Sequence, residues 1–436
     1  MCNIGVDLAQ ISRIKQSLEN PRFRTRVFSK AEQVFLFSNG IKILSAAANF
    51  AAKEAFSKAL GTGVRGFSLN EISVLRDDSG KPYLKLEGQA EKLAKINNLD
   101  FSVSLTHEAD LACAVVAAYK KAGGLPPILP ERLRRLQHRF GTDLNDGILL
   151  DASFVRSVFP KRNPLSHKGS YGKLTVLSGC ERYRGAAALC TAAALRSGAG
   201  IVTLASVPSV IDAVASKLYE PVYLPLPQNG EGTLSSLAVP ALLTQAKASS
   251  ALLIGCGLGR SEDITTTVKA LLETADCPVI LDADGLNAIA ERIDILRTAK
   301  RRTIITPHLG EMSRLCGKTV SEIQNDPVGI AKTFSKAYDV IVVLKDADTI
   351  VASPDGSLFF NTTGNAGMAR GGSGDVLAGI IAAFVCQGLS PEHAAACGVY
   401  LHGAAGDLAA AEGSMLGMLP SDMINVLPKL YHFAEE

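Results

Sequence analysis

The densest group of residues able to do chemistry is the run GGSGD at 371–375, which stands directly before the apolar stretch VLAGIIAAFV. Gly371, Gly372 and Gly374 at the start of a helix would bring several backbone N–H groups and the positive end of the helix dipole to one point, which predicts an anion site. Asp375 falls in the first helical turn, where an acid can simply stabilise the helix start. Beside a phosphate, the same carboxylate can instead take a proton from a hydroxyl that receives a phosphoryl group.

A second group lies near the N-terminus, in the alanine-rich stretch at 50–60. Glu54 and Lys58 stand four residues apart on one helix face, and the simplest interpretation is a surface ion pair. If this helix packs across the strand that carries Asp7, two carboxylates meet, as Mg²⁺ requires when substrate phosphates supply its other ligands. Lys58 would then contact a phosphate. His107, at the end of the strand VSLTH, either caps that strand or adds another phosphate contact.

Positive charge is concentrated in the same region. Residues 13–30 contain six basic residues against one acid, Glu19, and four of the six are Arg13, Arg22, Arg24 and Arg26. Such a run is either a solvated face or a docking patch for an acidic macromolecule.

Composition limits the class of protein. A chain of 436 residues that is 47% hydrophobic and 20% charged predicts two or three globular domains. Nine cysteines without a C-x-x-C pair or zinc-ligand spacing indicate reduced thiols and a cytoplasmic location. We find neither a signal-peptide pattern nor an apolar run of about 20 residues, so no membrane association is expected. A net charge of +3 gives no indication of nucleic-acid binding.

The elements that must position these residues change in character near residue 120. Residues 1–120 mix strands and helices, as in an α+β domain, and residues 121–149 are rich in Gly, Pro and basic residues, which predicts a linker. From 150 to 436, short β-branched runs alternate with alanine-rich helical stretches, which predicts an α/β domain with a parallel sheet covered on both faces. Six of those runs end in Gly, Asp, His or Lys. The carboxyl ends of the strands therefore predict a binding crevice.

The C-terminal motifs resemble a known family. GGSGDVLAG together with KDADT at 345–349 resembles the ribokinase-like superfamily, and most closely its ADP-dependent NAD(P)H-hydrate dehydratase branch. The resemblance continues through HKGSYGKLTVLSG (167–179), LDADGLNA (281–288) and TPHLGEMSRL (306–315), and thus covers roughly residues 150–436. It implies a ribokinase-like α/β/α sandwich with a mostly parallel sheet.

This resemblance also implies substrates and site residues. ADP would phosphorylate the ring hydroxyl of the S form of NADHX or NADPHX, and elimination would give NAD(P)H, AMP and phosphate. Asp375 would be the base, and Mg²⁺ would accompany the nucleotide. The hydrated nucleotide would lie against Ala186, Gly257, Gly259, His308 and Asp375. The adenine nucleotide would lie against Lys345, Asp346, Ala347, Asp348, Thr349 and Gly374. Two residues depart from the family pattern. Asp346 stands where the family usually has Gly, and an added carboxylate would weaken nucleotide binding unless it points away. Ser373 replaces the commoner Thr.

The N-terminal motifs resemble a different family. The ordered series G-V-D-L, FAAKEAFSKALGTG and SLTH looks like the 4′-phosphopantetheinyl transferases of the holo-[acyl-carrier-protein] synthase type, over residues 1–120. The resemblance implies that Asp7 and Glu54 bind the Mg²⁺ that bridges the pyrophosphate of coenzyme A, with Glu54 also catalytic. Lys58 and His107 would contact the phosphates of coenzyme A.

Partners follow from the same resemblance. Arg13, Arg22, Arg24 and Arg26 would dock the acidic acyl carrier protein, since electrostatic steering speeds such encounters. Relatives form trimers with sites at subunit interfaces, which implies a homo-oligomer. Asn49 departs from the family, which normally has Arg before the Phe-Ala motif, and this change removes a candidate contact to the coenzyme A phosphates.

The sequence therefore predicts a bifunctional fusion of a carrier-protein-modifying transferase with a nicotinamide-nucleotide repair lyase. Three alternatives stay open. In the first, the C-terminal domain is a small-molecule kinase, because the same glycine motif and aspartate serve phosphoryl transfer to sugars and vitamins. In the second, the N-terminal domain is a non-catalytic module that binds carrier protein or drives oligomerisation. In the third, only one half of the chain is active.

Overall fold

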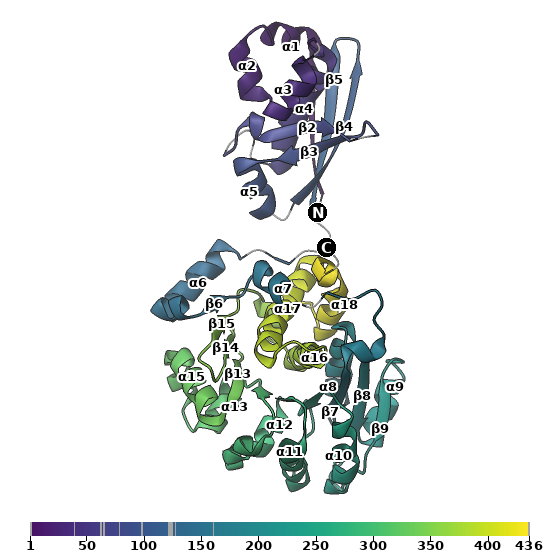
Figure 1. Cartoon of the computed structure of the whole chain (residues 1–436), viewed down its shortest axis with the longest axis vertical. Coiled ribbons are helices and arrows are strands. Elements are labelled where there is room, and N and C mark those ends of the chain that lie inside the picture. Colours follow the sequence, from purple (N-terminus) through teal and green to yellow (C-terminus); the bar gives the residue numbers. More distant parts are fainter. Residues whose placement is uncertain are drawn as a thin grey trace. The chain divides into compact units, whose positions relative to one another are not determined.

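The structure, a computed structural model, describes residues 2–38, 40–61, 63, 66–77, 79–96, 99–120, 125–126, 128–159 and 161–434. The chain divides into two compact units, residues 1–122 and 123–436 (Figure 1). Within the described stretches, no helix combines the length and the apolar character needed to cross a bilayer.

The N-terminal unit is built on a three-stranded antiparallel sheet in which β5 lies between β1 and β4. A hairpin of β2 and β3 and five helices complete it. The strands are β1 (Cys2–Gln10), β2 (Ile72–Arg76), β3 (Pro82–Leu86), β4 (Leu99–Glu108) and β5 (Leu111–Lys120). The helices are α1 (Ile11–Ser17), α2 (Pro21–Val27), α3 (Lys30–Phe37), α4 (Ile43–Leu60) and α5 (Gly88–Ile96).

Small side chains let α4 lie very close to β1. A Cβ added to Gly5 would stand 2.0 Å from the backbone oxygen of Ala55, so only glycine fits at this point of the strand. The alanines of α4 are correspondingly buried, with Ala51, Ala55 and Ala59 at zero exposure. Because the backbones approach so closely, Glu54 on α4 and Asp7 on β1 can meet at one edge of the contact.

The C-terminal unit is organised around a ten-stranded sheet in the order β6-β15-β14-β13-β12-β11-β10-β7-β8-β9. The pairs from β13 to β9 are all parallel, whereas β14 runs antiparallel to both of its neighbours. The predicted mostly parallel sheet is therefore confirmed. The strands are β6 (Ile148–Leu149), β7 (Lys173–Leu177), β8 (Ile201–Ser206), β9 (Val222–Pro225), β10 (Ala251–Ile254), β11 (Val279–Leu281), β12 (Thr303–Ile305), β13 (Val340–Leu344), β14 (Ile350–Ala352) and β15 (Leu358–Phe360).

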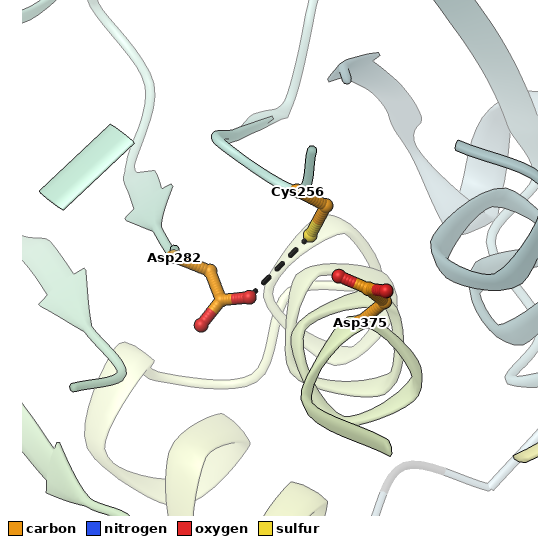
Figure 2. A group of neighbouring side chains, drawn as sticks. All are labelled: Cys256, Asp282 and Asp375. Carbon is orange, nitrogen blue, oxygen red and sulfur yellow. Dashed lines mark hydrogen bonds between the residues drawn. The ribbon is translucent and has the colours of Figure 1, made fainter. Parts of the chain in front are cut away.

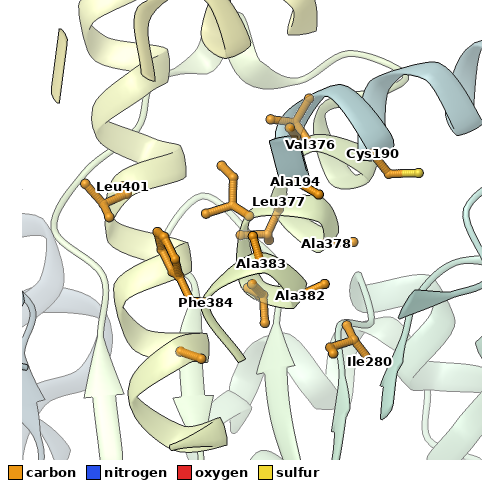
Figure 3. Packing of buried hydrophobic residues seen from close by; sticks show 14 of the residues in the cluster. Cys190, Ala194, Ile280, Val376, Leu377, Ala378, Ala382, Ala383, Phe384 and Leu401 are labelled. Atoms are coloured by element: carbon orange, nitrogen blue, oxygen red, sulfur yellow. The ribbon is translucent and has the colours of Figure 1, made fainter. Parts of the chain in front are cut away.

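Alternate strand residues point into two cores, one on each face of this sheet. One core is covered by α7 (Ala152–Val158), α8 (Arg184–Arg196), α9 (Pro208–Ala215), α16 (Ser373–Cys386), α17 (Pro391–Glu412) and α18 (Pro420–Leu430). The other is covered by α6 (Pro130–Phe140), α10 (Val239–Lys247), α11 (Glu262–Thr274), α12 (Asp284–Ile289), α13 (Leu309–Cys316), α14 (Val320–Asn325) and α15 (Pro327–Tyr338). Figure 3 shows how Leu377 and Phe384 of α16 pack with Leu401 of α17 in the first core.

The segment 121–149, which the sequence predicts to be a linker, contains an ordered helix. Residues 121–124 and 127 lie outside the described part of the chain, but α6 follows directly and belongs to the C-terminal unit. Leu136 and Phe140 are buried, and the ring of Phe140 packs against Phe360 at 5.1 Å between centroids. The Gly and Pro residues near 125 are typical of a linker, but Leu136 and Phe140, four residues apart, pack this helix against the core.

Candidate active sites

The glycine motif of the C-terminal unit forms the start of α16. Gly372 has a φ of 97°, in the left-handed region that favours glycine, and the helix begins at Ser373. Every residue from Val376 to Cys386 is buried, so the apolar body of the helix fixes the position of its first turn. His402 of α17 is buried and its Nε2 donates to the carbonyl oxygen of Ser373 at 2.9 Å. Burial lowers the pKa of His402 to about 4, so the ring is a neutral donor that supports the turn.

Asp375 meets two further side chains at the carboxyl ends of the strands (Figure 2). One ligand atom from each of Cys256, Asp282 and Asp375 lies within 4.8 Å of the others, and the Cys256 thiol donates to Asp282 at 3.5 Å. Cys256 follows β10 and Asp282 follows β11, so parallel strands bring them to one edge. The strand edge at which the sequence predicts a binding crevice therefore carries two carboxyl groups and a thiol.

Asp282 is held in place within this cluster by two hydrogen bonds. It is 1% exposed, and it accepts hydrogen bonds from the hydroxyl of Thr306 at 2.6 Å and from Nζ of Lys345 at 2.7 Å. Burial by itself lowers the pKa of Lys345, but the carboxylates of Asp282 and Glu311 outweigh it and raise that pKa above its ordinary value. Lys345 is therefore a permanent, partly buried cation.

The pKa of Asp375 is raised to about 7. The main cause is burial, and the negative charge of Asp282 adds to it, whereas the Cys256 thiol and the Lys345 ammonium act in the opposite direction. A carboxyl group with this pKa is both partly ionised and appreciably basic at neutral pH, which suits a general base.

The predicted nucleotide segment lies against the glycine motif. A Cβ added to Gly374 would stand 3.2 Å from Nζ of Lys345, so the two motifs are in contact. Asp346 does not point toward them, because one of its oxygens accepts from Arg139 of α6 and the other from the N–H of Ala347 at 2.8 Å. Asp348 is buried and accepts from Arg135 at 2.8 Å. The departure from the family at Asp346 is thus accommodated by Arg139, which lies in the segment predicted to be a linker.

Three residues predicted to bind the hydrated nucleotide lie together in a loop region. Gly257 has a φ of 64°, and a Cβ there would stand 2.7 Å from the Cβ of Ala186 at the start of α8. Gly259 follows, and its N–H donates to Asp284 at 2.8 Å. Gly257 thus packs on α8, whereas a Cβ at Gly259 would stand 3.0 Å from Thr233, so close packing explains both glycines.

His308 caps α13 and still exposes its ring. Its Nδ1 accepts from the N–H groups of Gly310 at 3.0 Å and Glu311 at 3.3 Å. More than half of the side chain, 55%, is exposed. Because Nδ1 is an acceptor, the ring proton lies on Nε2, which stands 3.4 Å from a carboxylate oxygen of Glu311.

In the N-terminal unit, Asp7, Glu54 and Lys58 converge. Nζ of Lys58 lies 2.8 Å from a carboxylate oxygen of Asp7 and donates to the carbonyl of Val6 at 2.9 Å. Burial and the charge of Asp7 raise the pKa of Glu54, and Lys58 opposes them. Lys58 therefore pairs with Asp7 rather than with Glu54, and the charge of Asp7 acts on the Glu54 carboxyl group.

Asn49 occupies the opposite face of α4. Its amide donates to Glu32 and to the carbonyl of Val74, both at 3.0 Å, and it is fully buried. Glu32 is also fully buried and forms a 2.7 Å ion pair with Lys53. Asn49 and Lys53 thus belong to a buried polar network that joins α3, α4 and β2, and the side chain of Asn49 points away from Glu54.

The remaining predicted residues of this unit are mostly exposed. Arg13, Arg22 and Arg26 are solvent-exposed, as is His107 near the end of β4. Arg24 differs, because its Nε donates to the carbonyl of Leu18 at 2.6 Å and its guanidinium lies 5.2 Å from the ring centroid of Phe37. Arg24 therefore helps to hold the helices of this unit together.

The family model for NAD(P)H-hydrate dehydratase matches residues 174–429, more than half of the chain. The chain belongs to the NAD(P)H-hydrate dehydratase family. A second model, that of the 4′-phosphopantetheinyl transferase superfamily, matches residues 3–116. Both predicted resemblances are confirmed, and the dehydratase match contains Ala186, Gly257, His308, Lys345 and Asp375.

Relatives in this family agree with the match. The chain is 40% identical over 308 residues to the bifunctional NAD(P)H-hydrate repair enzyme Nnr of Moorella thermoacetica, a match that covers 71% of this chain and 57% of that relative. It is 36% identical over 277 residues to the ADP-dependent (S)-NAD(P)H-hydrate dehydratase of Bacillus subtilis, covering 64% of this chain and 95% of the relative. The chain therefore spans little more than half the length of the bifunctional relative.

A solved structure from the same family also superposes on the chain. The ADP/ATP-dependent NAD(P)H-hydrate dehydratase from Bacillus subtilis, co-crystallised with ATP and Mg²⁺, is 34% identical and gives a TM-score of 0.54, covering 64% of this chain and 95% of that one. This likeness agrees with the parallel sheet and covering helices of the C-terminal unit.

Sequence analysis assigned no role to several residues of this site. Cys256, Asp282 and Thr306 follow strands, whereas Glu311 lies in the first turn of α13, and Asp282 lies inside the motif LDADGLNA. The signal that identifies the first three is their common place at the carboxyl ends of parallel strands. His402 gives no such signal, because its role depends on the packing of α17 against α16.

Proposed function

We propose that the C-terminal unit dehydrates the S form of NADHX and NADPHX at the expense of ADP, releasing NAD(P)H, AMP and phosphate. The observation that supports this most directly is a carboxyl group with a pKa near 7, Asp375, beside the backbone N–H groups at the start of α16. A base and an anion site in contact are what phosphoryl transfer to a hydroxyl requires.

The proposed reaction has two steps, a phosphoryl transfer and an elimination. Asp375 takes the proton of the substrate hydroxyl as its oxygen attacks the terminal phosphorus of ADP, and AMP leaves. The glycine N–H groups, the dipole of α16 and the ammonium of Lys345 stabilise the transferred charge. Phosphate is a better leaving group than hydroxide, so loss of phosphate and of a proton from the adjacent carbon restores the dihydropyridine ring.

Mg²⁺ fits this site as a companion of the nucleotide. The cluster of Cys256, Asp282 and Asp375 contains a thiol, which Mg²⁺ disfavours, and Asp282 is already bonded to Lys345 and Thr306. When bound to the phosphates, the ion would neutralise their charge.

The test is to incubate the protein with ADP and NADHX and to follow the return of dihydropyridine absorbance. We expect recovery that depends on ADP and is lost in Asp375→Asn. Absence of recovery, together with phosphorylation of a sugar or vitamin, would instead support the small-molecule kinase.

We further propose that the N-terminal unit transfers 4′-phosphopantetheine from coenzyme A to a serine of acyl carrier protein. The convergence of Asp7, Glu54 and Lys58 carries this proposal. Asp7 of β1 and Glu54 of α4 supply two carboxyl groups, a donor set that would hold Mg²⁺, and the ion would neutralise the charge of the phosphates. The serine oxygen attacks the phosphorus that bears the pantetheine arm, and 3′,5′-ADP leaves. Lys58 and His107 would contact the phosphates.

The partner of this reaction would be acidic. Arg13, Arg22 and Arg26 are exposed on α1 and α2 and offer a positive face to such a carrier. Transfer of a labelled phosphopantetheine arm to apo carrier protein tests the activity. Absence of transfer by the wild-type chain, with retained binding of the carrier, would identify a non-catalytic docking module.

An exposed apolar sheet face supports the proposed homo-oligomer. Ile4, Val6 and Leu8 of β1 are 65%, 47% and 61% exposed, and Val115, the register partner of Val6 on β5, is 38% exposed. Apolar side chains gathered on one face are typical of contact surfaces. Light scattering should therefore report an oligomer that Val6→Lys dissociates.

A further inference from the structure

The nucleotide segment 345–349 contains two acids in a place where phosphates are proposed to bind. Asp346 and Asp348 are both in contact with α6 rather than with solvent alone, and Asp348 is only 4% exposed. An uncompensated carboxylate in this segment would repel a nucleotide, because charges at the border of the protein interior are only partly screened.

Two arginines of α6 balance these acids. Arg139 donates to a carboxylate oxygen of Asp346, and its other terminal nitrogen donates to Asp348 at 3.2 Å. Arg135 donates to Asp348 at 2.8 Å. The second oxygen of Asp346 accepts from the N–H of Ala347 at 2.8 Å, so both oxygens are engaged within the segment and α6.

The position of α6 does not depend on these pairs. Leu136 and Phe140 anchor the helix in the core, and Arg132 forms two hydrogen bonds, at 2.8 Å and 2.9 Å, with the carboxylate of Asp407 on α17. Asp407 also accepts from the N–H of Gly364, in the segment that leads to the glycine motif. Arg139 is therefore held in place before any nucleotide arrives, and little ordering is needed on binding.

We propose that Arg139 is a positioning residue of the nucleotide site, which cancels the charge of Asp346 and keeps that carboxylate turned away from the phosphates of ADP. The inference rests on the proposed function of segment 345–349. It gives α6, at the start of the C-terminal unit, a direct influence on nucleotide affinity.

A double-variant cycle tests this role. The four proteins are the wild type, Arg139→Ala, Asp346→Asn and the double variant, with ADP affinity measured by calorimetry and KM and kcat by dihydropyridine recovery. Arg139→Ala should weaken ADP binding about tenfold, because the unpaired carboxylate of Asp346 would then repel the phosphates of ADP. This loss should shrink at high salt, and kcat at saturating ADP should change less than about twofold. The ADP affinity of the double variant should return to within about threefold of the wild-type value, because the negative charge at position 346 has been removed.

Two outcomes would overturn the proposal. Unchanged ADP affinity in Arg139→Ala would mean that Asp346 does not affect the site. A double variant as weak as Arg139→Ala would mean that Arg139 binds phosphate directly or only holds the fold, and thermal melts would tell these apart. Arg297→Ala is the matched control, because Arg297 forms an exposed pair with Asp294 at 3.1 Å on the same unit.

The cycle also separates this inference from the proposed function. Calorimetry with ADP needs no hydrated nucleotide, so a wild type that binds ADP without restoring the dihydropyridine would refute the dehydratase and leave the cycle interpretable. A wild type that does not bind ADP would refute both.

Discussion

Each of the two candidate sites contains a Lys–Asp ion pair, but the two pairs differ in how exposed they are to solvent. Nζ of Lys345 lies 2.7 Å from Asp282, with side-chain exposures of 18% and 2%, whereas Nζ of Lys58 lies 2.8 Å from Asp7, with exposures of 55% and 18%. The distances are nearly equal, but the first pair is sealed at the ends of parallel strands and the second stands at the edge of a helix–strand contact.

This difference in burial separates a fixed pair from an exchangeable one. A buried pair is costly to break, because removal of one partner leaves a charge without solvent. An exposed pair contributes little and can be replaced by a metal ion or a phosphate. We therefore interpret Lys345–Asp282 as a permanent part of the C-terminal site. Under the proposed transferase function, Lys58–Asp7 is a resting arrangement that opens when Mg²⁺ and coenzyme A bind.

The largest effect should come from the base of the buried site. Asp375→Asn should lower kcat for dehydration by about a thousandfold or more, because general bases contribute about 10²–10⁴. Phosphopantetheine transfer should not change. Steady-state kinetics of both reactions on one preparation provide the measurement, and Asp294→Asn on the surface is the control. Substantial dehydration by Asp375→Asn would assign the base to another group.

Removal of each lysine tests the contrast between the pairs directly. Lys345→Met should lower the free energy of unfolding of the C-terminal unit by about 3–5 kcal/mol, since it leaves Asp282 buried without a cation. Lys58→Met should cost less than about 1 kcal/mol. Denaturant unfolding of both variants measures these changes. Equal losses would show that burial does not distinguish the two pairs.

In the exposed site, Glu54→Gln should reduce phosphopantetheine transfer about a hundredfold, because one of two carboxylate ligands to Mg²⁺ is lost. Added Mg²⁺ should recover part of the rate. Glu19→Gln, an exposed acid of the same unit, should match the wild type. If Glu54→Gln transferred at the wild-type rate over a full Mg²⁺ titration, Glu54 would not be a metal ligand.

The smallest effect concerns pH. With a pKa of about 7, Asp375 should make kcat/KM for dehydration fall about tenfold per pH unit below neutrality. The same shift acts on stability. The folded state holds this proton more tightly than the unfolded state, so the stabilisation is complete below about pH 4 and is lost as the pH rises through about 7.

Asp375→Asn should therefore melt higher than the wild type at pH 8 and gain less at pH 5. Thermal melts of the two proteins across this range give the comparison. A difference in melting temperature that did not vary with pH would show that Asp375 has an ordinary pKa.

Local motifs explain most of what could be predicted. The sequence GGSGD before an apolar run is enough to place Asp375 in the first turn of a helix, and α16 begins at Ser373. The β-branched runs likewise predicted the parallel strands. Helix α6 was missed, because nearby Gly and Pro residues resemble a linker and only the burial of Leu136 and Phe140 shows otherwise.

Residue types and their spacing were enough to predict the two families, the parallel strands and a set of candidate site residues. The packing of the chain in space sets which charges meet and how deeply they are buried. Lys58 pairs with Asp7, 51 residues away, rather than with Glu54 one turn away, and Asp346 pairs with Arg139 across 207 residues. The physical reason is that charge pairing and pKa depend on distance and solvent access in space, which residue spacing along the chain does not contain.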